Sequence, residues 1–344
     1  MVSSEYYSFW IPVTHAIPQV GFVSSMTFGS ILLFLNYIGA QRYFGSYKYL
    51  ISAITILGML FSAAEILVYP VVHNHDAGAL FFSFEESLGL HSSWNRNFPL
   101  AGYTFFHAAT MSVLSVQFIY RYWAVFDSNK LKYFKGTYAI IWLLYCTHFG
   151  LQYSLGIYYF LARDSMTDEY FREELLLRYN ANIAEVPAMA ILAYDSIDGT
   201  VRWGNLMGIL NICLIVNIQY TIMAKCGRAM QSKMEEKIKV LSEALRKRHK
   251  QFFKVLIIQL ATPTIILFLP ITTIICLPIF NLKVTFPAGA IQCSFTLYPA
   301  MDSLIVMYVV SEYRLTARKI PAFFCKRFEP VRPIKISTTT SQPI

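Results

Sequence analysis

The stretch that decides the fold, residues 99–125, reads PLAGYTFFHAATMSVLSVQFIYRYWAV. It carries no charge before Arg121 and is long enough to cross a bilayer as a helix, since a crossing takes about 20 apolar residues. Arg121 is followed by Tyr122 and Trp123, a mixture typical of a helix that leaves hydrocarbon for the headgroup layer. His107 lies fourteen residues earlier, near the same helical face. If Arg121 faces protein rather than lipid, His107 does so too.

The composition places the whole chain in a membrane. Of its residues 56% are hydrophobic and 14% are charged, which is too apolar for a soluble domain of this length. Segments surrounded by hydrocarbon must be helices to satisfy their own backbone groups. We therefore predict an all-α membrane protein, a seven-transmembrane helix bundle that occupies residues 1–311. The predicted spans are about 17–38, 49–72, 99–123, 137–161, 203–224, 255–280 and 288–310.

Charge predicts the orientation of this bundle. Six of the 29 Lys and Arg residues lie on the side of the N-terminus, and the other 23 lie on the opposite side. The positive-inside rule then predicts the N-terminus outside and the tail, residues 312–344, in the cytoplasm. The tail is basic at first, and its later Pro/Ser/Thr-rich part is predicted to be disordered. The net charge of +9 reflects this topology and a basic surface near anionic lipid rather than nucleic-acid binding.

Two polar residues lie in the outer half of the predicted spans. At 1.5 Å per residue, Glu65 is roughly 10 Å and His107 roughly 12 Å below the outer end. Either the two form a polar pair, or Glu65 is protonated and bonded to a nearby group while His107 is merely packed. Asp302 is about 10 Å deeper than Glu65 by the same count. It is expected to meet inner-half hydroxyls such as those of Thr55, Ser112 or Thr262.

We predict a cavity in this outer half that is apolar, with few polar groups, and suited to a small, largely uncharged molecule. Every residue assigned to it can also be explained by structural packing alone. The assigned residues are Glu65, Tyr103, His107, Met111, Met207, Asn211, Thr273 and Gln292.

The loops offer weaker signals. His73, His75 and Asp76 could suggest a metal site, but the loop carries no further convergent ligand, so we predict no metal and no cofactor. Residues 166–179 have helical character, and residues 191–203 are typical of a β-hairpin or turn around an Asp-Gly pair.

The predicted inner side has two features of its own. Residues 225–254 read as a basic helix that extends the fifth and sixth spans, and three prolines between 263 and 278 predict kinks in the sixth. Cys325, in the sequence AFFCKRF, is either a palmitoylation site or a plain interfacial cysteine.

No nucleophile–base pair, phosphate loop or metal set is apparent, so we predict that the chain is not an enzyme. Four motifs occur in order: FGSYKYL after the first span, FIYRYWAV in the third, FFKVLIIQLATPTIILFLP in the sixth, and YPAMDSLIVMY followed by EYR in the seventh. Together they resemble the nematode seven-transmembrane chemoreceptors of the Str family over nearly the whole chain.

The resemblance implies an odorant-type receptor of the plasma membrane, on sensory-neuron cilia, that detects a small chemical cue and activates a heterotrimeric G protein. In that family the seventh-helix motif often has Pro after its Asp, where this chain has Ser303. Tyr120 stands where rhodopsin-like receptors have an acid, so their ionic lock cannot be transferred. The residues expected to serve coupling and activation are Arg121, Tyr122, Arg246, Lys250, Pro299, Asp302 and Arg314.

Two other classes remain open, a ligand-gated cation channel and a transporter. An inverted seven-span channel would need the N-terminus inside, against the charge distribution. A transporter is expected to show repeated, broken halves with charges at the midplane, and no such repeat is apparent. The sequence leaves the oligomeric state open.

Overall fold

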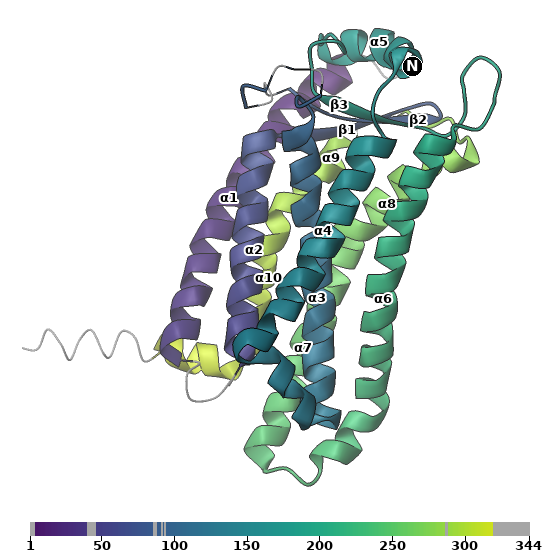
Figure 1. Cartoon of the computed structure of the whole chain (residues 1–344). Helices are drawn as coiled ribbons and strands as arrows, with labels where there is room; N and C mark the ends of the chain where they lie inside the picture. The colour runs from purple at the N-terminus through teal and green to yellow at the C-terminus, as the bar shows by residue number, and fades with distance from the viewer. Residues whose placement is uncertain are drawn as a thin grey trace, which may run out of the picture.

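The computed structural model describes residues 4–39, 46–84, 88–90, 92, 94–285 and 288–318. Over these residues the chain forms an elongated bundle of long helices, with a small β-sheet and helix α5 (Ser165–Tyr179) across one end (Figure 1). The predicted helical bundle is therefore confirmed. The helices of the bundle are α1 Ser4–Gly39, α2 Tyr47–Val68, α3 Phe98–Phe126, α4 Ile140–Phe160, α6 Trp203–Ile238, α7 Glu243–Pro263, α8 Leu269–Cys276, α9 Gly289–Gln292 and α10 Leu297–Val309.

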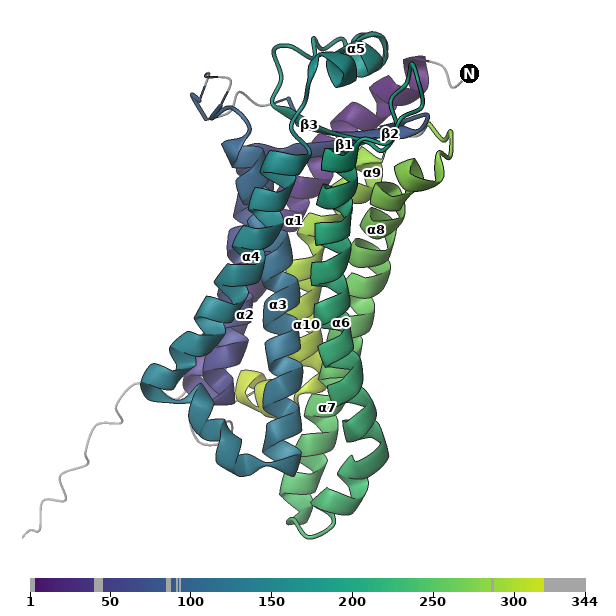
Figure 2. The ribbon, with the colours of Figure 1, turned by 45° about the vertical axis from the view of Figure 1, so that its right-hand side comes forward.

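Hydropathy supports a membrane setting for this bundle. Among the described residues, four helical stretches are long and apolar enough to cross a bilayer: Pro12–Ile38, Tyr47–Val68, Trp203–Ile238 and Glu243–Phe280. Helix α3 runs through the middle of the bundle and packs on α2, α4 and α6 (Figure 2). Most of its residues are buried against protein. It therefore has less need of an apolar surface toward lipid than a peripheral helix has.

The sixth predicted span is interrupted, as its prolines predict. A π-helical turn, Thr264–Phe268, separates α7 from α8 and follows Pro263 directly. Proline lacks a backbone N–H and crowds the preceding turn, which explains the break at this point. The hydroxyl groups of Thr264 and Tyr220, on α6, lie within 2.7 Å of each other and tie the break to its neighbour. A short 3-10 helix, Leu277–Phe280, ends this span.

The seventh predicted span is also not one continuous helix. Helix α9 passes through a 3-10 turn, Cys293–Thr296, before α10 begins. At the end opposite the sheet, α6 and α7 extend well past the predicted membrane boundary, which confirms the predicted helical extension of residues 225–254. Two short 3-10 helices, Ser128–Phe134 and Gly136–Ala139, connect α3 to α4.

A three-stranded antiparallel sheet crosses the end of the bundle in the order β1 (Pro70–His75), β2 (Gly78–Ser83), β3 (Ala188–Leu192). Helix α2 ends at Val68, because Tyr69 adopts a left-handed conformation (φ 47°) and Pro70 cannot continue a helix. The predicted helix to Val72 is therefore wrong at its end: these residues form the first strand instead.

Alternation gives the sheet two faces. Val72, Phe81 and Met189 pack against the helical bundle, whereas Val71 and Phe82 pack under α5. The sheet and α5 together form a two-layered cover, which we call the lid, over one end of the bundle (Figure 2). Helix α5 confirms the predicted helix at 166–179 and begins with a capping box, in which Asp164 accepts a hydrogen bond from the Thr167 N–H.

The loop after β3 confirms the predicted turn. Tyr194 and Val201 form an isolated antiparallel bridge, and Gly199 has a positive φ of 71° that favours glycine. The backbone N–H of Asp195 donates to the carbonyl of Thr200 at 2.8 Å, which closes the turn. A helical segment at 311–318 follows α10 at the opposite end of the bundle, and Cys325 lies outside the described residues.

Candidate functional site

A pocket lies directly beneath the lid. Its walls come from all three strands of the sheet and from helices α3, α4, α6 and α8, with Gln292 and Phe295 from the broken seventh span. The enclosed cavity has a volume of about 60 Å³. The lining contains no Lys, Arg, Asp or Glu. Such a pocket fits an uncharged molecule.

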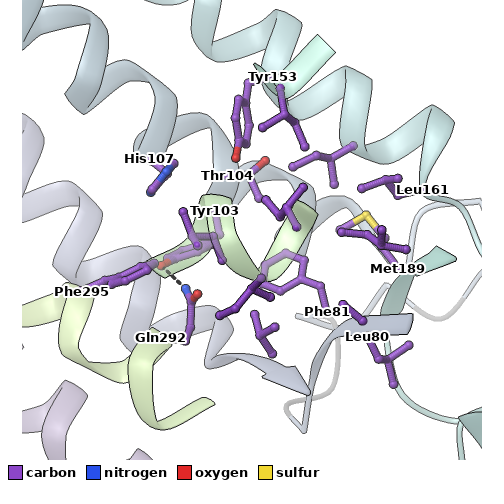
Figure 3. Close-up of a pocket in the computed structure, with 18 residues that line it drawn as sticks. Leu80, Phe81, Tyr103, Thr104, His107, Tyr153, Leu161, Met189, Gln292 and Phe295 are labelled. Atoms are coloured by element: carbon purple, nitrogen blue, oxygen red, sulfur yellow. Dashed lines mark hydrogen bonds between the residues drawn. The ribbon is translucent and has the colours of Figure 1, made fainter. Parts of the chain in front are cut away.

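Gln292, Tyr103 and His107 lie together on one side of the pocket, whereas the hydroxyl groups of Thr104 and Tyr153 lie apart from them (Figure 3). Gln292 donates a hydrogen bond from Nε2 to the Tyr103 hydroxyl at 2.7 Å, and both side chains are buried. His107 lies on the same side, one helical turn from Tyr103, while Phe81 and Met189 of the lid lie on the other. The pocket is therefore a mainly hydrocarbon surface with a few hydrogen-bonding groups, of which Gln292 and Tyr103 form one corner.

Glu65 is the buried charge nearest to this corner. Its carboxyl group hydrogen-bonds with the hydroxyl of Tyr103, and its Oε2 has no hydrogen-bond partner among the described residues. No bond joins Glu65 to His107, whose ring lies instead among Phe268 at 5.4 Å and Phe295 at 6.0 Å, centroid to centroid. Of the two sequence-based alternatives, the separate arrangement is found.

Five of the eight predicted ligand-binding residues lie in or near the pocket. Tyr103, His107 and Gln292 line the pocket, and Glu65 supports Tyr103 from behind. Met111 is fully buried in the same apolar core but does not border the pocket.

The other three residues lie away from this pocket. Met207 is 43% exposed on the outer surface of α6, and Thr273 is exposed and donates only to the Leu269 carbonyl of its own helix. Asn211 faces α4, where it exchanges hydrogen bonds with Gln152 at 2.9 Å and 3.2 Å. Each sits on a helical face that the rotation of its helix turns away from the pocket.

The lid residues are the part of the site that sequence reasoning missed. Val72, Ala79, Phe81, Met189 and Ile191 all line the pocket from the strands. The available signal was the pair of short apolar runs at 70–72 and 79–82, separated by a polar turn.

Amide side chains join the helices below the pocket. The Oε1 of Gln219 on α6 accepts hydrogen bonds from Ser115 on α3, at 2.6 Å, and from Tyr145 on α4, at 2.7 Å. Asn205 accepts from the backbone of Leu192 at 2.7 Å and so ties α6 to the lid. The buried amides of α6 thus make hydrogen bonds between elements, as amides within a membrane bundle commonly do.

Arg121 occupies the opposite end of the bundle. Its guanidinium carbon lies 3.4 Å from the ring centroid of Tyr47, on α2, and 3.6 Å from that of Phe252, on α7. The side chain is 7% exposed, and its Nε and Nη2 have no hydrogen-bond partner among the described residues. Arg121 is thus held by two aromatic faces, which join α2, α3 and α7 through cation–π contacts.

Two residues of the seventh span make close contacts between helices. Pro299 packs on Gly58 of α2 so closely that an added Cβ there would lie 2.9 Å from the proline ring. Asp302 accepts a hydrogen bond from Gln259 of α7 at 2.8 Å and one from Tyr298 at 3.5 Å. The expectation that Asp302 meets threonine or serine hydroxyls was wrong, because an amide on α7 reaches it instead.

The remaining residues assigned to coupling lie at the end of the bundle opposite the lid. Tyr122 stacks on Phe126, and Arg314 is exposed near the ring of Tyr308. In the connection between α6 and α7, Arg246 donates to the backbone carbonyl of Lys239. Lys250 forms an exposed ion pair with Glu235 of α6. Such pairs contribute little stability and leave the basic surface open to a partner.

A charged cluster lies inside the lid itself, between β1 and α5. Glu174 forms ion pairs with His73 at 3.3 Å, His75 at 3.6 Å and Arg178 at 3.1 Å. Burial raises the pKa of Glu174, but hydrogen bonds from His73 and Arg178 outweigh it and lower the pKa from 4.5 to about 2. The sequence placed only Asp76 beside the two histidines, and the structure groups Glu174 with them instead. Glu174 is 101 positions away from His73 in the chain.

Membrane-capable helices with an apolar pocket at one end and a basic surface at the other are the architecture of seven-transmembrane receptors. Comparison with known proteins agrees. Residues 14–318 match the family model described as "Serpentine type 7TM GPCR chemoreceptor Str". The chain therefore belongs to the Str family of seven-transmembrane chemoreceptors, a family of receptors rather than enzymes.

Relatives of this chain cover nearly its whole length. It is 32% identical over 313 residues to the G-protein coupled receptor str-33 of Caenorhabditis elegans, and this alignment covers 90% of each chain. It is 26% identical over 333 residues to the serpentine receptor class r-10 of the same organism, with 96% of each chain covered. The class r-10 receptor of Caenorhabditis briggsae is 27% identical over 324 residues, or 92% of each chain.

Proposed function

We propose that this chain is a chemosensory receptor that binds a small, largely apolar molecule beneath the lid and activates a heterotrimeric G protein at the opposite end. The observation that carries the proposal is the pocket. Its lining is hydrocarbon except for the corner formed by Tyr103, Gln292 and neighbouring polar groups. Apolar surface supplies affinity in such a site, and a few polar groups fix the orientation of the ligand.

The corner also limits the chemistry of the ligand. Gln292 and the Tyr103 hydroxyl can accept or donate one or two hydrogen bonds, which suits an alcohol, ketone or ester on a hydrocarbon frame. A charged ligand would find no opposite charge among the lining residues, and burying an unpaired charge is costly. We therefore expect uncharged odorant-like molecules to activate the receptor and their carboxylate or ammonium analogues to fail.

The distribution of basic residues supports placing the G-protein contact at the end of the bundle opposite the lid. Six of the 29 Lys and Arg residues fall on the lid side, so the lid faces outward and the connection between α6 and α7 faces the cytosol. Arg121, Tyr122, Arg246, Lys250 and Arg314 then lie toward the G protein. Pro299 and Asp302 act within the bundle by joining α10 to α2 and α7. The relatives named as G-protein coupled receptors support this assignment, and we place the receptor in the plasma membrane of sensory cilia.

A ligand screen in cells that express a promiscuous G protein tests the proposal. We expect calcium responses to small uncharged compounds that depend on both the receptor and the G protein. Epitope tags at the two ends should be read on intact cells at the N-terminus and only after permeabilisation at the C-terminus. A ligand-evoked current that persists without G proteins, or an N-terminal tag inside the cell, would favour the channel alternative.

A further inference from the structure

The lid holds a second cluster of polar side chains that the pocket does not use. Alternation along β1 turns His73 away from the bundle and toward α5, and His75 lies two residues further on the same face. Glu174 comes down from α5, one helical turn before Arg178. His73 is 1% exposed and Glu174 8%, so the cluster lies between the two layers of the lid.

The donor atoms of this cluster have the spacing of metal ligands. His73 Nε2 lies 3.3 Å from Glu174 Oε1, and His75 Nδ1 lies 3.6 Å from Glu174 Oε2. In a tetrahedral site with bonds of about 2.0–2.1 Å, two ligand atoms are separated by roughly 3.3–3.4 Å. One donor atom from each of the three residues lies within 4.8 Å of the other two. A cation at their centre would bring donor atoms that are now up to 4.8 Å apart to roughly 3.4 Å.

Two details indicate that ion pairs alone do not account for the arrangement of the two imidazole rings. The Nδ1 of His75 is buried and has no hydrogen-bond partner among the described residues. A buried polar atom of this kind normally has a partner. His73, in turn, has its Nδ1 3.1 Å from the hydroxyl of Tyr179. A second hydrogen bond that fixes the far nitrogen is the usual support of a metal-binding imidazole.

We propose that His73, His75 and Glu174 form a binding site for a transition-metal dication, Zn²⁺ in first place, that joins β1 to α5. Two imidazoles and one carboxylate suit Zn²⁺ or Cu²⁺, whereas Ca²⁺ and Mg²⁺ prefer sites made wholly of oxygen. Arg178 donates to Glu174 Oε1 at 3.1 Å and orients the carboxylate, whose two oxygens each face one of the histidines. Three protein ligands leave a fourth position for water.

A metal ion here would act on the receptor through the lid. The sheet that carries His73 on its outer face presents Val72 and Phe81 to the pocket on its inner face. Fixing β1 to α5 therefore stiffens the roof over the ligand. This consequence rests on the proposed function, but binding of the metal does not.

The test uses the purified full-length receptor in detergent, without a polyhistidine tag. Zinc bound per chain is measured after equilibration over a range of free Zn²⁺, and thermal unfolding is followed in the same samples. We expect about one saturable Zn²⁺ per chain and a raised unfolding temperature, with no effect of Mg²⁺. Glu174→Gln and His75→Gln should each weaken binding at least tenfold, the scale seen on loss of metal-site groups.

Two matched controls separate the site from general effects. Glu173→Gln removes the neighbouring, exposed carboxylate of α5, and His148→Gln removes an exposed histidine of α4. Neither should change zinc binding. If Glu174→Gln does not fold, His75→Gln still decides the matter, because His75 is partly exposed and its replacement disturbs less packing.

Zinc uptake that is equal in Glu174→Gln and Glu173→Gln, or that never saturates near one per chain, would overturn the proposal and leave a cluster of ion pairs only. Neither odorant nor G protein enters this measurement. Its failure is therefore distinguishable from failure of the proposed chemosensory function.

Discussion

Replacing Phe252 with Leu should raise the activity of the receptor without ligand. Phe252 covers one face of the buried Arg121 guanidinium at 3.6 Å, and Tyr47 covers the other at 3.4 Å. A cation–π contact with a desolvated cation is worth about 2 kcal/mol. Leu keeps the apolar contact but lacks the aromatic face, so we expect α7 to lose about 1–2 kcal/mol of its attachment to α3. At tenfold per 1.4 kcal/mol, its inner end should separate from α3 roughly 5–30 times more often.

Basal nucleotide exchange on a co-expressed G protein, normalised to receptor at the cell surface, measures this change. Phe253→Leu is the matched control, because the same substitution one residue along falls in a different apolar cluster, with Leu114 and Phe118. Unchanged basal activity in Phe252→Leu, or an equal rise in Phe253→Leu, would refute the role of the Arg121 stack as the contact that holds the inner end closed.

Three further substitutions test the polar contacts of the bundle. Gln292→Leu should raise the half-maximal concentration of a hydrogen-bonding ligand roughly 3–10-fold, whereas Thr273→Val, outside the pocket, should not; equal dose–response curves would count against the corner. Gln219→Leu removes the acceptor of the Tyr145 hydroxyl, while the Ser115 hydroxyl keeps the Ser112 carbonyl, and should lower the free energy of unfolding in detergent by about 1–3 kcal/mol; an unchanged melting temperature would contradict this. Asp302→Asn keeps a hydrogen-bonding group beside Gln259 and should therefore fold. It should alter G-protein activation less than Asp302→Leu does. A larger change in Asp302→Asn than in Asp302→Leu would argue against this contact.

The sequence was informative wherever length, charge or a capping pattern decided the structure. The charge-free stretch ending at Arg121 predicted one helix, and α3 spans Phe98–Phe126. The helix at 165–179 was predictable because its ends carry strong local signals, an Asp164 cap and Asn180 in a left-handed conformation.

The rotation of helix α6 about its own axis could not be predicted in the same way. A helix in water shows its buried face by the contrast between apolar and polar residues. In a membrane both faces are apolar, so Met207, which is 43% exposed, and Ile212, which is 3% exposed and lines the pocket, look alike in sequence. Asn211 was misplaced for the same reason: its amide bonds to α4 rather than to a ligand.

The lid was missed because its contacts are distant in sequence. Strands of five and six residues carry little periodic signal, and β3 pairs with β2 across more than one hundred residues. Glu174 joins His73 over a similar separation, so the spacing within His73-Asn-His75 could not reveal a third ligand. Tertiary packing alone brings these groups together.

The central claim is that the pocket beneath the lid is where the ligand acts. A dose–response measurement of ligand-evoked G-protein activation on Ile212→Phe and Leu214→Phe tests it most directly. Both lie on α6, but Ile212 lines the pocket whereas Leu214 is 54% exposed on the outer surface. At equal surface expression, we predict that Ile212→Phe abolishes the response or weakens it at least tenfold and that Leu214→Phe leaves it intact. An unchanged response in Ile212→Phe would contradict the account.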